Sequence, residues 1–119
     1  MRRAYAHKAQ GQSQMTGFFG HTHIHQVFHS PDCDIQWLDD TRFHVPVDAL
    51  CVVMVGTVGQ PLHETDLRAA WVLWDPVARV VEFRKTTYNR LRAARDIVKA
   101  GLPLESARQL LTKEEAVLL

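Results

Sequence analysis

This chain of 119 residues has few cysteines, almost no net charge and no long apolar run. Its two cysteines, Cys33 and Cys51, are too few and too far apart for a thiolate zinc knuckle. We expect Cys51 to be a buried apolar side chain and Cys33 to be a free thiol, which fits a reducing cytoplasm. A net charge of +1 gives no reason to expect binding to nucleic acid or to a membrane. No apolar stretch approaches the length that a membrane-spanning helix needs.

Acidic residues are also missing from residues 1–31. This composition is similar to that of a transit peptide, but the same stretch already holds a histidine motif. No apolar segment follows Met1, as one would in a secretory signal. Residues 1–14 are predicted to be a polar segment or the remnant of a helix. The apolar content of 46% is enough for one globular core, so we predict one domain over residues 15–119.

The apolar patterning predicts strands first and helices last. Residues 49–55 and 68–74 are apolar on both faces, as in central strands that are covered on both sides. If the chain is a fragment, part of the sheet that they form should lack its normal cover and expose an apolar patch. Residues 80–88 alternate instead, with Val81 and Phe83 facing inward. Further strands are expected at residues 15–19 and, as a hairpin around Asp39-Asp40-Thr41, at residues 35–38 and 42–45.

Two helices are expected at the end of the chain. Residues 89–100 carry one apolar stripe, Asn89 can cap the first turn, and Gly101 ends the helix. A second helix is predicted over residues 104–113. The fold class is therefore α+β, or half of a layered α/β/β/α sandwich with two C-terminal helices.

The tetrapeptide Gly20-His21-Thr22-His23 directly follows the apolar run Met15–Phe19. Side chains alternate along a strand, so His21 and His23 are expected side by side at the carboxyl end of that strand. Gly20 lets the chain turn tightly at this point. Neutral imidazole is the commonest protein ligand for transition metals, so the pattern favours a metal site.

His25 continues this series of alternating histidines, in a loop expected to run to about Phe28. Neighbours of this kind lie roughly 6.5–7 Å apart along a strand. That spacing is too wide for one ion with bonds of about 2 Å, so we favour a solvent-facing or phosphate-adjacent position for His25. The remaining histidines lack the spacing of ligands and are expected at the surface, with His63 in a polar loop near a substrate cleft: His7, His29, His44 and His63.

Several stretches resemble, in order, the C-terminal half of calcineurin-like metallophosphoesterases. The order and spacing of these stretches make the resemblance specific, and it covers the chain from about Met15 to Leu111. Two later pieces are similar to the tail of the smaller bacterial members. The stretches are Gly20–Ile24, Val52–Pro61 and Ala69–Asp75, followed by Tyr88-Asn89 and Ala100–Pro103.

The resemblance implies a dinuclear metal centre that hydrolyses phosphomonoesters or phosphodiesters by metal-activated hydroxide. By this resemblance, His21 would bind the second ion and His23 the first. The ions would be divalent, and two histidines do not distinguish Mn, Fe, Zn and Ni. Gly56-Thr57-Val58-Gly59 resembles the family's Gly-Ser-Val-Gly turn near the active site, with the hydroxyl kept at Thr57. The positions expected to be substrate-adjacent or structural are Gly20, His25, Gly56, Thr57 and Gly59.

The other ligand motifs of this family are missing. The chain contains no Asp-x-His, no Gly-Asp and no Gly-Asn sequence. The bridging carboxylate, the amide ligand and the acid histidine therefore have no counterpart. We expect residues 15–119 to be the C-terminal half of the domain, with two metal ligands, no catalytic residue and no efficient activity alone.

Three hypotheses follow for the function. The first is the C-terminal portion of a phosphoesterase, as a truncated product, a gene-calling fragment or one half of a split enzyme whose partner chain supplies the other half. The second is a non-catalytic interaction module that kept the sheet and lost the chemistry. The third is a small stand-alone metal-binding domain that uses His21, His23 and His25, with Asp32 or Asp34 as a further ligand.

Overall fold

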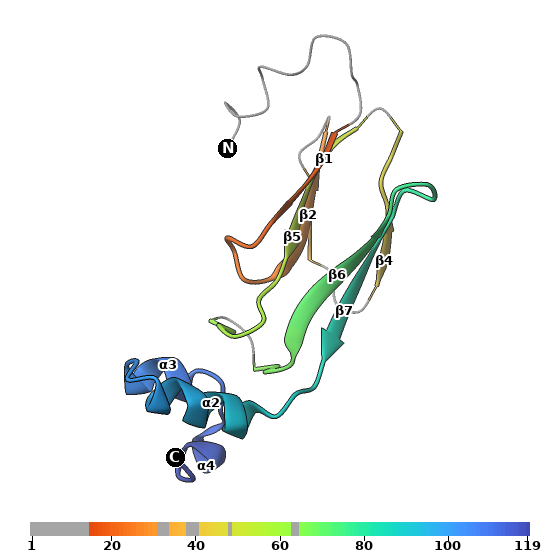
Figure 1. Cartoon of the computed structure of the whole chain (residues 1–119). Coiled ribbons are helices and arrows are strands. Elements are labelled where there is room, and N and C mark those ends of the chain that lie inside the picture. Colours follow the sequence, from red (N-terminus) through yellow and green to blue (C-terminus); the bar gives the residue numbers. More distant parts are fainter. Residues whose placement is uncertain (1–14, 31–33, 38–40, 48, 63–64) are drawn as a thin grey trace.

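The computed structural model describes residues 15–30, 34–37, 41–47, 49–62 and 65–119. The predictions for the N-terminal segment and for His7, Asp32, Cys33 and His63 lie outside these residues. In the described part, two β-sheets come first and short helices follow, which is the predicted α+β order (Figure 1). No helix in this part is long and apolar enough to cross a membrane.

The larger sheet contains four strands in the order β1-β5-β2-β3. Strand β5 is parallel to β1 and antiparallel to β2. Because β5 lies between β1 and β2, the segment from Gly20 to Ile24 passes over the carboxyl end of β5. This places it beside the residues that follow β5. The four strands are β1 (Met15–Phe19), β2 (His25–His29), β3 (Asp34–Trp37) and β5 (Leu50–Val55).

The smaller sheet has the order β4-β7-β6, with all pairs antiparallel. It packs face to face against the larger sheet. Val81 and Phe83 of β7 are buried in the core between them, as predicted. From the larger sheet, Val27, Cys51 and Val53 enter the same core. The three strands are β4 (Arg42–His44), β6 (Ala69–Asp75) and β7 (Val80–Thr86).

The predicted hairpin over residues 35–38 and 42–45 is wrong. Strand β3 pairs with β2, whereas β4 pairs with β7 in the other sheet. The two segments flank a polar Asp-Asp-Thr sequence, which suits a crossing between sheets as well as a hairpin turn. Phe43 packs against the core between the sheets, and this burial favours the position of β4 in the smaller sheet.

Residues 68–74 were predicted to form a central strand, and this is wrong because β6 is an edge strand of the described three-stranded sheet. Part of the sheet was expected to lack its cover if the chain is a fragment, and one face of β6 is indeed open. Trp71 is 36% exposed and Leu73 is 50% exposed. The opposite side chains, Val72 and Trp74, pack against the core. Only one face of this sheet packs on the larger sheet, so the apolar residues of the other face stay at the surface.

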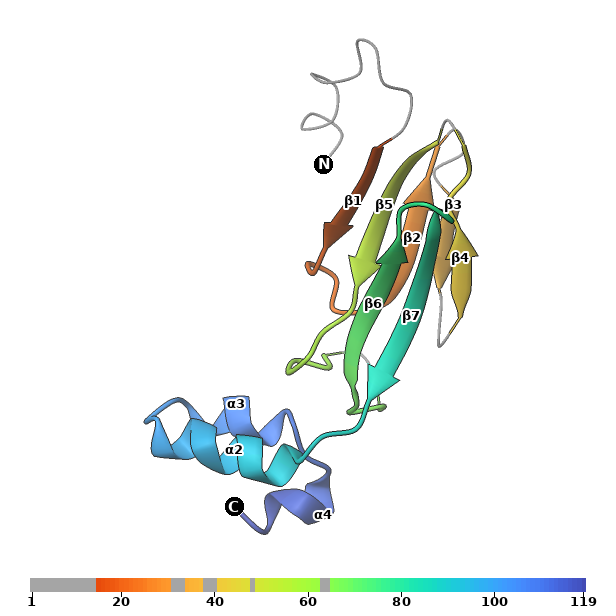
Figure 2. The same cartoon turned by 45° about the vertical axis from the view of Figure 1, so that its right-hand side comes forward.

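The first helix of the described residues is α2 (Arg90–Lys99), and the Asn89 side chain caps it by accepting a hydrogen bond from Arg92 N. The second predicted helix ends sooner than expected, as α3 (Leu104–Arg108). Thr112 then forms a capping box with Glu115, and a separate helix, α4 (Lys113–Ala116), begins. The helices lie at one end of the two sheets and not over a face (Figures 1 and 2).

Candidate functional site

The two predicted ligands lie in the turn that follows β1. Strand β1 ends at Phe19, as expected, at the end of the sheets that is nearer the helices. His21 is exposed and His23 is partly buried. The alternation argument used to place them is wrong, because the chain turns after Phe19 instead of continuing as a strand. The structure leaves their role as metal ligands a prediction.

The left-handed residue of this turn is His23, with a φ of 62°, and not Gly20. A Cβ atom at Gly20 would meet nothing within 4 Å. We expected glycine at position 20 because of a tight turn, but in the described structure Gly20 has neither a positive φ nor a close neighbour that would require it. A non-glycine residue adopts a positive φ at an energetic cost, so His23 needs contacts that stabilise this conformation.

A second loop follows β5 and lies beside the histidine turn. Gly56 has a φ of +80°, and a Cβ atom there would lie 2.6 Å from Ala70 Cβ and 3.0 Å from His25 Cδ2. Glycine is therefore required at this position. The next residue, Thr57, accepts a hydrogen bond from Ala70 N at 2.9 Å. The loop is thus fixed to β6, which agrees with the architectural role expected for the Gly56–Gly59 turn.

One hydrogen bond joins the two loops. His23 Nδ1 lies 2.9 Å from the backbone carbonyl oxygen of Gln60. A carbonyl oxygen only accepts hydrogen bonds, so Nδ1 carries the hydrogen. In the neutral ring, Nε2 then carries the lone pair. Histidines that bind metals usually donate their other ring N–H to a carbonyl or a carboxylate, so His23 is set up as a ligand through Nε2.

His25 is not at the surface, in contrast to the solvent-facing prediction. It is 3% exposed, and its ring centroid lies 5.0 Å from that of Phe83. The turn after β1 reverses the chain, so His25 begins β2 and points into the space between the sheets. The ring lies close to Gly56 and fills the space that a larger residue there would need. Among the described residues, His25 therefore has a structural role.

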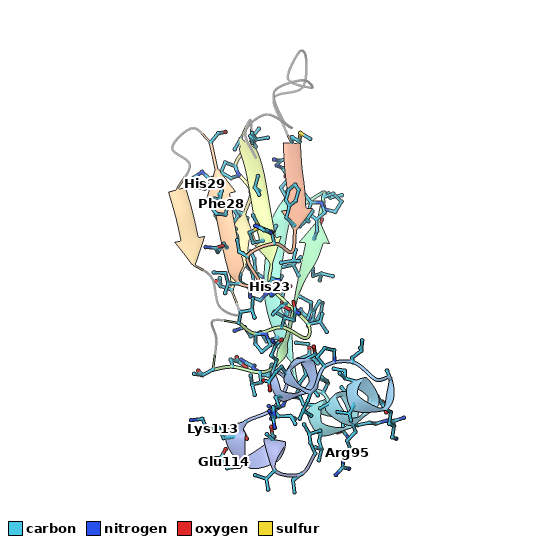
Figure 3. The ribbon with its side chains drawn as sticks, turned by 90° about the vertical axis from the view of Figure 1, so that its left-hand side faces the viewer. His23, Phe28, His29, Arg95, Lys113 and Glu114 are labelled. Carbon is cyan, nitrogen blue, oxygen red and sulfur yellow. The ribbon has the colours of Figure 1, made fainter. Side chains whose placement is uncertain are left out.

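The described members of the ligand set proposed for the stand-alone metal domain, which exclude Asp32, are not brought together. Asp34 pairs with His29 at the far end of β2, four residues beyond His25. That separation corresponds to about 13 Å along the strand. In Figure 3, His23 lies much nearer the helices than His29, which is the residue that Asp34 faces on the neighbouring strand. Within the described residues, no group of three or more histidines, cysteines or acidic residues could hold a metal ion.

A charged cluster at the start of β6 escaped the sequence analysis. Arg68 binds the Asp66 carboxylate through Nε and Nη2, with Nη2 2.7 Å from Oδ2. Lys85 Nζ lies 3.4 Å from the same oxygen, and the Lys85 side chain is only 5% exposed. The hydrogen bonds from Arg68, supported by the charge of Lys85, hold the pKa of Asp66 well below its usual range. Lys85 is distant from Asp66 in sequence, so no local pattern indicates the cluster.

The comparisons with known proteins support the fold. No family model and no curated protein sequence matches the chain. Among solved structures, the chain is similar to a crystal structure described as a metallophosphoesterase from Sphaerobacter thermophilus, with a TM-score of 0.70 and 25% sequence identity. The match covers 80% of this chain and 40% of that chain. The chain therefore has the fold of part of a metallophosphoesterase and spans less than half the length of this neighbour.

Proposed function

We propose that this chain supplies His21 and His23 to the dinuclear metal centre of a phosphoesterase, of which it forms the C-terminal portion. The observation that carries the proposal is the 2.9 Å hydrogen bond between His23 Nδ1 and the Gln60 carbonyl oxygen. A ring held in this way presents Nε2 to a metal ion. The similarity to a metallophosphoesterase structure gives separate support for the class of reaction.

His21 and His23 are of the right chemical type to bind a divalent metal, but two ligands are too few to hold an ion tightly. Imidazole nitrogen suits Mn, Fe, Zn and Ni, and His21 is exposed enough to reach an ion. Tight metal sites combine three or four protein ligands, and these loops offer two. The remaining ligands, including a carboxylate to balance the charge, must come from polypeptide outside the described residues. Divalent ions bound there would polarise a phosphate ester and activate water for hydrolysis.

The edge of β1 is the place where we propose that this additional polypeptide packs. Among the described strands, β1 pairs with β5 alone. Its apolar side chains Met15, Phe18 and Phe19 are exposed. A strand edge with exposed apolar side chains is favourable for adding another strand. The neighbouring structure extends well beyond the matched region, so a polypeptide of suitable length exists in a protein of this fold.

The metal proposal is tested by NMR on the isolated chain with Zn²⁺ and with Mn²⁺. We expect weak binding that shifts the ring signals of His21 and His23 with Zn²⁺ and broadens them with Mn²⁺. His23→Ala should abolish the effect at His21, whereas His44→Ala, at an exposed site on β4, should not. Equal effects at every histidine, or none at these two, would overturn the proposal.

Activity provides a second test of the same proposal. The isolated chain should show negligible turnover of an aryl phosphate with or without added metal, because each ion would receive one imidazole from it. Robust metal-dependent hydrolysis that disappears in His23→Ala would show that the chain holds a complete site. That result would contradict the proposal that it supplies only a portion of one.

A non-catalytic interaction module is the second candidate, and the exposed apolar side chains of β6 favour it. Trp71 and Leu73 lie at the surface of the smaller sheet. This module predicts a partner that covers these residues and no dependence of its binding on His21 or His23. Gel filtration and binding of a hydrophobic dye examine the exposed surface directly. A stable monomer that binds no dye would count against both the module and the proposed packing at β1.

A further inference from the structure

We infer that Thr57 is a positioning residue for His23: its hydroxyl fixes Gln60 so that the Gln60 carbonyl holds the imidazole in the tautomer with hydrogen on Nδ1. The inference concerns the metal-free protein. Its importance for metal binding rests on the proposed function.

The relay consists of two hydrogen bonds in series. Thr57 Oγ1 accepts a hydrogen bond from Gln60 N at 3.0 Å. The Gln60 carbonyl oxygen then accepts one from His23 Nδ1 at 2.9 Å. The first bond fixes the peptide group on the N-terminal side of Gln60, and the second uses the peptide group on its C-terminal side. The position of the carbonyl therefore depends on the backbone torsions of Gln60 alone.

The sequence restricts these torsions. Gln60 precedes Pro61, and the proline ring disfavours the helical conformation for the residue before it and favours an extended one. The Gln60 carbonyl also accepts a hydrogen bond from Leu62 N at 2.8 Å, which closes a tight turn around Pro61. A carbonyl oxygen has two lone pairs, so it can accept from Leu62 and His23 together. The acceptor is thus held in place from both sides.

The start of the relay is anchored on the body of the protein. The Thr57 carbonyl accepts a hydrogen bond from Ala70 N at 2.9 Å, and Gly56 packs closely against Ala70. Strand β6 therefore fixes the backbone that carries the hydroxyl. The end of the relay is the strained residue, since His23 has a φ of 62°. The contact with Gln60 compensates for this strain, and it ties the histidine turn to the sheets.

The chemical consequence is the choice of ring nitrogen. A neutral imidazole exchanges its hydrogen between Nδ1 and Nε2, and the partner of one nitrogen sets the protonation of the other. With Nδ1 donating to a fixed carbonyl, Nε2 is left as the acceptor and faces away from Gln60. If the carbonyl lost its position, both tautomers would be populated, and only a fraction of the molecules would present Nε2 to an ion.

The test measures the tautomer of His23 by long-range ¹H–¹⁵N NMR in the metal-free chain, at a pH where the ring is neutral. In the wild type we expect a protonated Nδ1 and an unprotonated Nε2. Thr57→Val removes the hydroxyl at nearly constant volume and should shift the two ¹⁵N signals toward each other. Thr57→Ser keeps a hydroxyl and should restore the wild-type pattern, while the His44 signals stay unchanged in both variants.

Two outcomes would overturn the inference. One is a folded Thr57→Val protein in which the His23 ring signals are those of the wild type. The other needs no variant, because a wild-type His23 with an unprotonated Nδ1 contradicts the relay directly. This second outcome applies even if Thr57→Val fails to fold.

Zn²⁺ binding separates this inference from the proposed function. Mutating a hydrogen-bond partner of a metal-binding histidine typically lowers the affinity for the metal about 10- to 100-fold. We therefore expect Thr57→Val to weaken Zn²⁺ binding about tenfold and Thr57→Ser to restore it. If the tautomer shifts as expected but Zn²⁺ affinity is the same even in His23→Ala, the proposed function fails and the relay stands. If His23→Ala abolishes Zn²⁺ binding but Thr57→Val leaves the tautomer unchanged, the relay fails and the proposed function stands.

Discussion

Among the glycine-to-alanine substitutions in the histidine turn and in the loop after β5, Gly56→Ala should destabilise the protein the most. Two costs combine at this position. A non-glycine residue with a φ of +80° is strained by about 1–2 kcal/mol. The new Cβ would also lie 2.6 Å from Ala70 Cβ, and forcing extra atoms into a packed site typically costs about 1–3 kcal/mol. Neither Cβ atom can rotate away, so the expected loss is about 2–5 kcal/mol.

Urea denaturation followed by tryptophan fluorescence measures this loss. The slope for a small domain is about 1–3 kcal/mol per molar urea, so a loss of about 3 kcal/mol lowers the midpoint by about 1–3 M. Two matched variants add the same methyl group without the clash. At Gly20 it would meet nothing within 4 Å, and at Gly59 it would meet Leu110 at 3.7 Å. Each should change stability by less than about 0.5 kcal/mol.

A second substitution separates the two costs. In the Gly56→Ala background, Ala70→Gly removes the Cβ atom that lies too close. It should recover the part of the packing cost that comes from Ala70, but not the contact with the His25 ring or the backbone strain, so the double-mutant cycle should give a coupling of about 1–2 kcal/mol. The reasoning is refuted if Gly56→Ala is as stable as Gly20→Ala, or if Ala70→Gly destabilises both backgrounds equally.

Three further predictions concern other parts of the fold. The pKa of Asp66 lies below its usual range, so its stabilising effect is complete above the unfolded pKa of about 3.9 and is lost as the pH falls through the lower folded value. Asp66→Asn, which removes the charge facing Lys85, should therefore destabilise the protein at pH 6 and reduce its acid sensitivity in urea titrations between pH 6 and pH 2; an unchanged acid limb would contradict this. Burial raises the pKa of the Cys51 thiol to about 11, so in a Cys33→Ser variant Ellman's reagent at pH 8 should react only after unfolding, and rapid reaction of the folded protein would be the contrary result. Asn89→Ala removes the cap of α2 and should cost about 1 kcal/mol in thermal or urea unfolding, with Asn89→Asp as the control that keeps the cap.

The parts of the fold that the sequence predicts well are those governed by local chemistry. Asn89 and Gly101 mark the ends of α2 because a cap and a left-handed glycine act within a few residues. The alternation of Val81 and Phe83 with polar residues likewise places β7 correctly. For the candidate site, the position of β1 and of the histidine turn after it was also predictable, because an apolar run followed by a polar motif is a local signal.

The remaining features depend on contacts between distant segments. The insertion of β5 between β1 and β2 is not encoded near either strand, so the reversal that buries His25 could not be predicted from alternation. The hydrogen bond from His23 to Gln60 joins residues 37 positions apart. Because its acceptor is a backbone carbonyl, no side-chain pattern indicates it. Trp71 and Leu73 look like core residues, but their exposure depends on what covers the sheet.

The separation of β1 from β2 by β5 also affects how the protein acquires its structure during synthesis. The two strands cannot form a hairpin with each other, although only the segment from Gly20 to Ile24 lies between them. The contacts that hold the histidine turn, with β5 between the strands and with the Gln60 carbonyl, require residues 50–60 to be synthesised first. Until then β1 has no pairing partner among the described strands, whereas β2 can already pair with β3. Pairings between segments distant in sequence slow folding and leave strand edges open to aggregation in the meantime. The hydrogen bond that holds His23 therefore cannot form before Gln60 has been synthesised, although His23 itself belongs to the turn directly after β1.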